Sequence, residues 1–199
     1  GSGSGGGGSE DGLGLVSSDA SRAAGDPEAV PDVVAAMQRF GGGLFATVAE
    51  QPGNLAASPY SVALALAMTL NGAVGATADE MSAVLAPAGL ETSRLNDGLN
   101  ALEQALEKLA GPVRRADGTA TTVELAVASA LFGEASTTWK EPFLEVLARE
   151  YGAGLRTVDF VRASEKAREL INAWTADQTN DRIPELIPDG VLDALTRLV

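Results

Sequence analysis

The feature that most constrains this chain is a change of hydrophobic period near residue 121. Before it, from residue 31 to residue 109, apolar side chains recur every three or four positions, which is typical of amphipathic helices. Over residues 121–132 the period becomes two, with Val123, Leu125 and Val127 on one face. The other face carries mostly alanine, so we expect a strand that is covered on both faces.

The predicted order is four helices, then strand, helix, strand, helix and the start of a last strand. Helices are predicted at residues 31–48, 58–70, 77–85, 92–109, 138–151 and 163–178, and strands at 121–132, 155–160 and 195–199. A sheet of two strands is marginal alone, so the sequence predicts an α+β fold that supplies strands to a larger sheet. Because long open strand edges promote aggregation, we expect that this half does not fold cooperatively by itself.

The helix predicted at residues 58–70 is apolar on nearly every side from Val62 to Met68, so it belongs in the middle of a protein. Ser58 is a favourable N-cap residue and Pro59 suits the first helical position. The next helix begins with Thr77 and has a glutamate three residues later, a spacing that predicts a capping box.

The N-terminal residues differ in composition from the rest. Residues 1–9 read GSGSGGGGS, a flexible sequence that cannot bury apolar area. Two interpretations stay open: an expression linker, or the tether of a secreted or lipid-anchored protein, which would place the protein outside the cell. Small polar residues continue to Asp26, so we expect residues 1–28 to be disordered and residues 29–199 to form the folded part.

Charge and composition exclude several classes of function. The net charge of −13 disfavours binding to nucleic acids and to anionic membranes. The chain has no histidine and no cysteine, which removes the Ser-His-Asp triad and thiolate nucleophiles, and we expect no enzyme. No uninterrupted apolar run is long enough to span a bilayer.

Five strings of residues resemble one family in order and spacing. They are NLAASPYSV at residues 54–62, LNGAVGATADE at 70–80, YGAGLRTVDF at 151–160, INAWTADQTNDRI at 171–183 and LTRLV at 195–199. Together they resemble the first half of a serpin, of the bacterial type. Thr175, and the pair at residues 181–182, depart from the family pattern without changing this interpretation.

The resemblance implies an inhibitor of serine proteases, with cysteine proteases as another target class, that needs no cofactor. A protease cleaves an exposed reactive-centre loop, and the freed loop inserts as a strand into the central sheet. That loop lies near the C-terminus of a serpin and is outside this chain. A non-inhibitory serpin-fold protein that binds ligands or acts as a chaperone is the alternative.

The resemblance also assigns a role to Ser58 and Ser61, the two serines of the family's SPxS motif. In serpins these hydroxyls hold the sheet shut, a position called the shutter; otherwise Ser58 is a helix cap and Ser61 a small core residue. Helix 92–109, which binds heparin in some serpins, carries only Arg94 and Lys108 among several acidic residues. We therefore expect no heparin-type polysaccharide as a partner.

Overall fold

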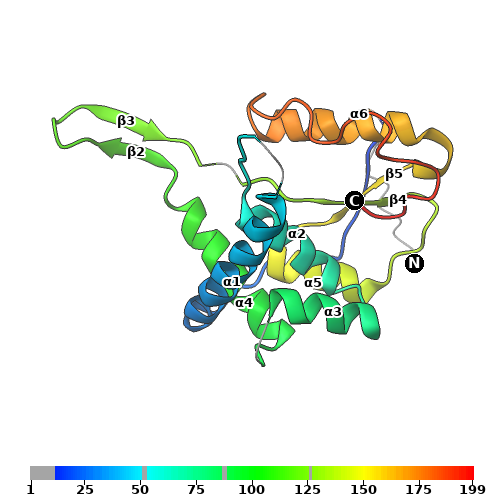
Figure 1. Cartoon of the computed structure of the whole chain (residues 1–199), viewed down its shortest axis with the longest axis horizontal. Helices are drawn as coiled ribbons and strands as arrows, with labels where there is room; N and C mark the ends of the chain where they lie inside the picture. The colour runs from blue at the N-terminus through cyan, green and yellow to red at the C-terminus, as the bar shows by residue number, and fades with distance from the viewer. Residues whose placement is uncertain (1–11, 51–52, 87–88, 126) are drawn as a thin grey trace. The chain divides into compact units, whose positions relative to one another are not determined.

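The computed structural model describes residues 12–50, 53–86, 89–125 and 127–199 (Figure 1). They divide into two compact units. One is Arg22–Ser129, here called the helical unit. The other comprises Ala130–Val199 and the N-terminal residues up to Ser21, here called the sheet unit.

The helical unit contains the helices that the sequence predicts before residue 110, namely α1 (Val30–Val48), α2 (Pro59–Leu70), α3 (Ala76–Leu85) and α4 (Thr92–Glu107). A 3-10 turn that was not predicted, η1 (Pro27–Ala29), precedes α1. Helix α1 contacts α2, α3 and α4. Helix α2 is buried along one side, with Ala63, Leu64, Ala67 and Met68 almost fully covered, but Val62 is 39% exposed, so burial on every side was not confirmed.

The start of α3 differs from the prediction. The helix begins at Ala76, and its N-cap is Gly75, whose φ of 59° lies in the left-handed region that glycine adopts readily. No side chain donates or accepts a capping hydrogen bond there, so the predicted capping box of Thr77 and Glu80 is wrong. Because the glycine occupies the cap, Thr77 lies inside the first turn.

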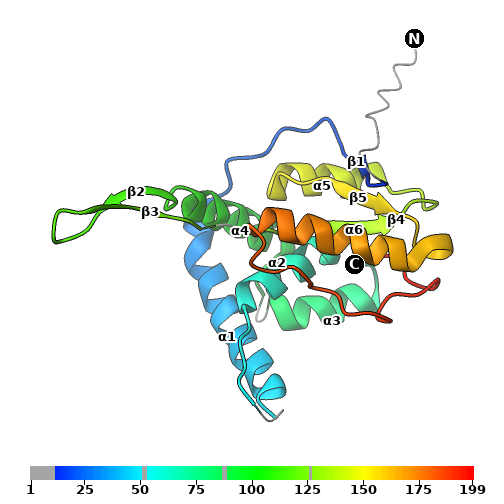
Figure 2. The ribbon, with the colours of Figure 1, turned by 90° about the horizontal axis from the view of Figure 1, so that it is seen from above.

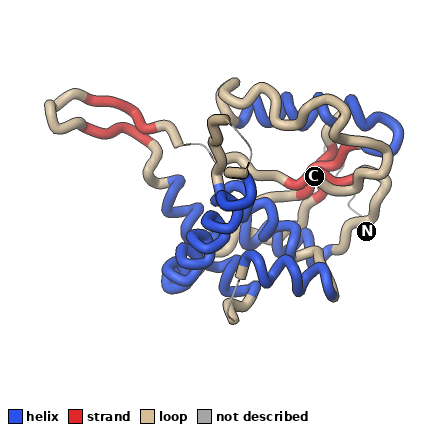
Figure 3. The backbone as a smooth tube through the Cα atoms, viewed as in Figure 1, coloured by secondary structure: helices blue, strands red, loops and turns tan. Residues whose placement is uncertain are grey.

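The segment after α4 also differs. The sequence pattern predicts no element between residues 109 and 121 and one strand over residues 121–132, but β2 (Gly111–Arg114) and β3 (Ala120–Val123) form an antiparallel hairpin (Figure 3). The next strand, β4 (Leu131–Glu134), is separate, and residues 124–125 and 127–130 belong to no strand. A strand requires a hydrogen-bonded neighbour. β3 finds one in β2, and β4 finds others in the sheet unit.

The sheet unit is built around three strands in the order β1-β5-β4. Its further elements are β1 (Gly14–Val16), α5 (Glu141–Tyr151), β5 (Leu155–Val158) and α6 (Phe160–Gln178). β5 is parallel to β4 and antiparallel to β1. The strand predicted from residue 195 is present only as an antiparallel bridge between Leu198 and Gly133, flanked by two hydrogen bonds between Phe132 and Val199 of 2.8 and 2.9 Å.

Helix α6 covers one face of this sheet (Figure 1). Its Ala167 and Ile171 join Phe132, Val158 and Phe160 in a buried apolar cluster, against which Trp174 packs. The Trp174 ring, which is partly buried, meets the Phe132 ring edge-on at 5.4 Å.

Part of the N-terminal segment is ordered, contrary to prediction. Residues 1–11 lie outside the described residues, but Gly14–Val16 pairs with β5, and Arg22 bonds to side chains of α4. Composition suggested a coil because these residues bury little apolar area themselves. Backbone pairing and ion pairs hold them instead.

Candidate functional site

Ser58 and Ser61 lie together at the start of α2 in the helical unit. The Ser58 hydroxyl accepts a hydrogen bond from the Ser61 backbone N–H at 3.3 Å, so Ser58 is the N-cap that the sequence predicts. The two hydroxyl oxygens are 2.9 Å apart and share a second hydrogen bond. Ser58 is exposed, whereas Ser61 is half-buried. The shutter role stays a prediction, because it concerns a sheet in the other unit.

Between the two serines, Tyr60 has a half-buried side chain whose hydroxyl has no hydrogen-bond partner among the described residues. Burial, together with the negative charge of Glu103, raises the pKa of Tyr60 to about 12. The phenol is therefore neutral at ordinary pH and cannot serve as a base.

The most elaborate polar cluster in the sheet unit is centred on Glu134, which is only 2% exposed. One carboxylate oxygen accepts hydrogen bonds from the backbone N–H and the hydroxyl of Ser136, at 3.0 and 2.7 Å. The other accepts from the backbone N–H groups of Phe160 and Val161, at 2.8 and 3.2 Å. Glu134 thus ties the end of β4 to the first turn of α6.

Burial acts to raise the pKa of Glu134, but the hydrogen bonds from Ser136, Phe160 and Val161 outweigh it, and the pKa lies below its usual value. The first turn of a helix also favours a negative charge. The carboxylate is accordingly ionised and satisfied at neutral pH. It is a structural anchor, since these four bonds join β4 to Ser136 and to the first turn of α6.

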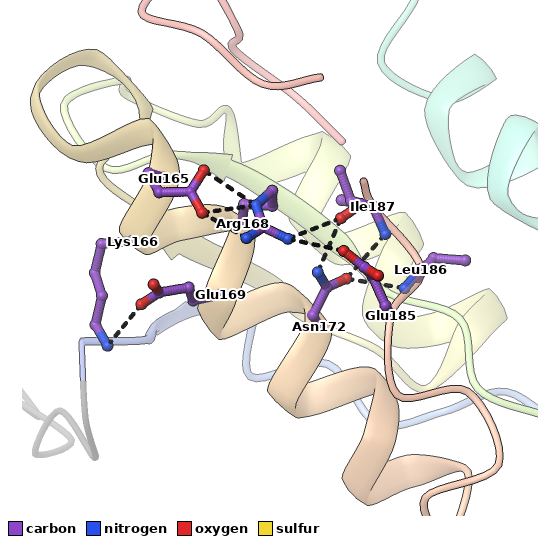
Figure 4. A network of polar contacts seen from close by, with 8 residues as sticks. All are labelled: Glu165, Lys166, Arg168, Glu169, Asn172, Glu185, Leu186 and Ile187. Atoms are coloured by element: carbon purple, nitrogen blue, oxygen red, sulfur yellow. Dashed lines mark hydrogen bonds and ion pairs between the residues drawn. The ribbon is translucent and has the colours of Figure 1, made fainter. Parts of the chain in front are cut away.

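A second anchor joins α6 to the chain that follows it (Figure 4). The Asn172 side chain accepts hydrogen bonds from the backbone N–H groups of Leu186 and Ile187 at 3.0 and 2.9 Å, and donates to the Ile187 carbonyl at 2.9 Å. Arg168 donates to the same carbonyl and pairs with Glu165 and Glu185. Ile187 is held in the apolar cluster by these contacts.

Sequence reasoning found only part of this arrangement. Asn172 lies in one of the recognised strings, but neither its bonds nor those of Glu134 were predicted. Glu134 leaves no local signal, because its partners in α6 are 26 and 27 residues away. The first anchor fixes α6 on the sheet, and the second fixes the chain after α6 to that helix.

Charged residues of α4 form ion pairs with residues elsewhere in the helical unit. Glu103 and Glu107 form ion pairs with Arg22, at 2.5 and 3.1 Å. Arg94 donates to Asp32 at 2.8 Å. Lys108 caps the C-terminal end of α4. None of the described helices is both long and apolar enough to cross a membrane.

Comparison with known proteins identifies the class of protein. The model of the family described as "Serpin (serine protease inhibitor)" matches residues 35–199, so this chain belongs to the serpin family. Among curated proteins, the leukocyte elastase inhibitor of Bos taurus is 40% identical over 83% of this chain and 41% of its own length. The leukocyte elastase inhibitor A of Mus musculus is 36% identical over 78% of this chain and 38% of its own length.

Solved structures agree on the fold. An Arabidopsis serpin in its native stressed conformation matches with a TM-score of 0.69 and 23% identity, over 85% of this chain and 42% of its own. Serpin-12 of Manduca sexta matches with a TM-score of 0.66 and 26% identity, over 82% of this chain and 42% of its own. The chain thus spans about two fifths of the length of the relatives it matches. These relatives come from animals and a plant, and the bacterial type stays a prediction.

Proposed function

We propose that the full-length protein inhibits serine proteases by reactive-loop cleavage and strand insertion. The observation that carries the proposal is the family match over residues 35–199, together with 40% identity to a relative named leukocyte elastase inhibitor. A protease of the elastase type is therefore the first target to test, with cysteine proteases as a further class.

The sheet unit supports this proposal by its topology. Strand insertion needs a sheet to which a further strand can pair. Here β4 has β5 as a parallel neighbour on one side and the bridge at Leu198 on the other. Helix α6 is tied to β4 through Glu134 and to the following chain through Asn172.

The test uses the full-length protein, including its reactive loop, and a purified elastase. An inhibitor of this kind forms an equimolar complex that survives heating in detergent, because the protease is held by an acyl bond. A protease whose catalytic serine is replaced by alanine provides the control, since it cannot form that bond. Failure to form a stable complex with elastase and with a broad panel of serine and cysteine proteases would overturn the proposal.

Cleavage of the loop separates the two serpin alternatives. Insertion of the cut loop adds a strand to the sheet, so the cleaved inhibitor unfolds at a markedly higher temperature than the intact protein. A non-inhibitory binding or chaperone-like protein would be cleaved without that gain.

The proposal includes a shutter role for Ser58 and Ser61, supported by their match to the SPxS motif and by their mutual hydrogen bond of 2.9 Å. It also includes an extracellular location, which rests on the Gly/Ser-rich residues 1–9, outside the described residues. The mass of the protein isolated from its source tests that location. An N-terminus that is lipidated, or processed near residue 1, supports it, and an unprocessed start well upstream contradicts it.

A further inference from the structure

The residues before the family-matched part form an additional edge strand in the sheet unit. The family match begins at residue 35, but Gly14–Val16 already pairs with β5 (Figure 2). The pairing is antiparallel, with Gly14 opposite Thr157 and Val16 opposite Leu155. Since β4 occupies the other side of β5, β1 covers the side that would otherwise be the open edge of this three-stranded sheet.

Glycines in β1 and next to β5 allow the two strands to approach closely. A Cβ atom on Gly14 would collide with the Thr157 hydroxyl, so a residue without a side chain is needed opposite that threonine. A Cβ atom on Gly154 would lie 2.9 Å from Leu15, so the glycine before β5 makes room for the incoming strand. Leu13, just before β1, packs against the apolar cluster under α6.

The same segment is held a second time, within the helical unit. Arg22 donates to Asn100 at 3.0 Å and pairs with Glu103, and the side chains of Arg22 and Glu103 are only 25% and 17% exposed. Ion pairs that are partly buried and hydrogen-bonded are stronger than exposed ones. Gly25 approaches α4 so closely that a Cβ atom would lie 2.5 Å from the Ala101 nitrogen. The N-terminal segment is therefore a specifically docked extension.

We propose that residues 12–29 are an edge-protecting extension, in which β1 occupies the free edge of β5 and prevents that edge from pairing with a second copy of the protein. An open strand edge presents unpaired N–H and C=O groups and is a template for association. β5 is buried at Leu155 and Val158 and is held firmly by β4, so its open side would be a rigid template. This proposal does not depend on protease inhibition.

The experiment compares two deletions in the full-length protein. Removing residues 1–17 takes away β1, whereas removing residues 1–11 leaves it and serves as the matched control. Two substitutions repeat the comparison without shortening the chain: Gly14→Val places a side chain against Thr157, and Ser21→Val introduces the same side chain at an exposed position. Hydrogen exchange of the backbone amides of residues 155–157 and sedimentation velocity are measured for all four variants.

We expect the deletion of residues 1–17 and Gly14→Val to speed exchange at residues 155–157 by about tenfold or more in dilute protein. Both should also form dimers as concentration rises, and exchange at these residues should slow again in the dimer. The deletion of residues 1–11 and Ser21→Val should behave as the parent protein. The proposal is overturned if the longer deletion stays monomeric, if residues 155–157 remain protected without β1, or if dimers form without renewed protection there.

Discussion

Ser58 and Glu134 each hold the start of a helix, but in contrasting surroundings. Ser58 caps α2 through a bond to a residue three positions later, at an exposed site. Glu134 holds the first turn of α6 from a strand 26 residues earlier and is almost fully buried. The first contact is local and can be recognised from sequence. The second exists only because the chain folds back on itself.

The surroundings also determine how much each contact contributes to the stability of the folded protein. A neutral hydrogen bond at the surface replaces one made with water, and its net contribution is small. A buried carboxylate has already lost its water, so each hydrogen bond that it accepts offsets part of that cost. Loss of the Glu134 charge should therefore lower the free energy of unfolding far more than loss of the Ser58 hydroxyl, although only Ser58 belongs to a recognised motif.

The largest effect is expected for Glu134→Gln. The new amide group would direct N–H groups at backbone or hydroxyl donors that the carboxylate now satisfies, leaving buried donors unpaired. We expect a loss of about 3 kcal/mol in the free energy of unfolding of the full-length protein. Urea unfolding measures it. Glu145→Gln, at an exposed pair with Arg149, is the control and should change little. Equal small losses in both variants would show that the Glu134 cluster is not an anchor.

The pH dependence of stability provides the second test of Glu134. Its pKa is lowered in the folded protein, so the folded state favours the ionised form. The stabilisation is therefore complete above the unfolded value, near pH 4.5, and is lost as the pH falls below it through the folded pKa. The free energies of unfolding of the parent and of Glu134→Gln should therefore become more alike as the pH falls through this window. A difference that stays constant down to the lowest accessible pH would contradict the assignment.

A smaller effect is expected for Asn172→Ala. Three hydrogen bonds to residues 186 and 187 are lost, and the backbone N–H of the buried Ile187 is left without its partner. We expect a loss of about 2 kcal/mol, with faster hydrogen exchange at residues 185–188. Gln178→Ala, on an exposed part of the same helix, is the control. Unchanged exchange in the Asn172 variant would mean that this segment is held by Arg168 and apolar packing instead.

These sites show where sequence reasoning succeeds. Helices α1 and α4 follow from periods of three to four residues, and α2 from its apolar run and the local chemistry of the Ser58 cap. In place of the one strand predicted at residues 121–132, the structure has two short strands with different partners. β3 pairs with β2 and β4 pairs with β5, and the sequence pattern of a strand does not show which partner it finds. The disorder predicted to residue 28 was wrong from β1 onward. Composition cannot show that a distant strand, β5, offers its edge for pairing. The family resemblance was confirmed because its motifs were judged together.

The smallest effects are expected for substitutions of the two serines. Comparing Ser58→Ala with Ser61→Ala distinguishes a role in helix capping from a shutter role. Ser58→Ala removes the N-cap and should cost about 1 kcal/mol. Ser61→Ala keeps the cap, because its backbone N–H still donates to Ser58. The local account therefore predicts for Ser61→Ala only the small loss of the exposed hydroxyl bond to Ser58. The shutter role predicts a loss of about 1 kcal/mol there too, since a hydroxyl that holds the sheet is gone. Unfolding of the full-length variants, with the exposed Ser93→Ala as control, measures both. A neutral Ser61→Ala beside a destabilised Ser58→Ala would leave Ser58 a local cap and end the shutter proposal, without affecting the assignment to the family.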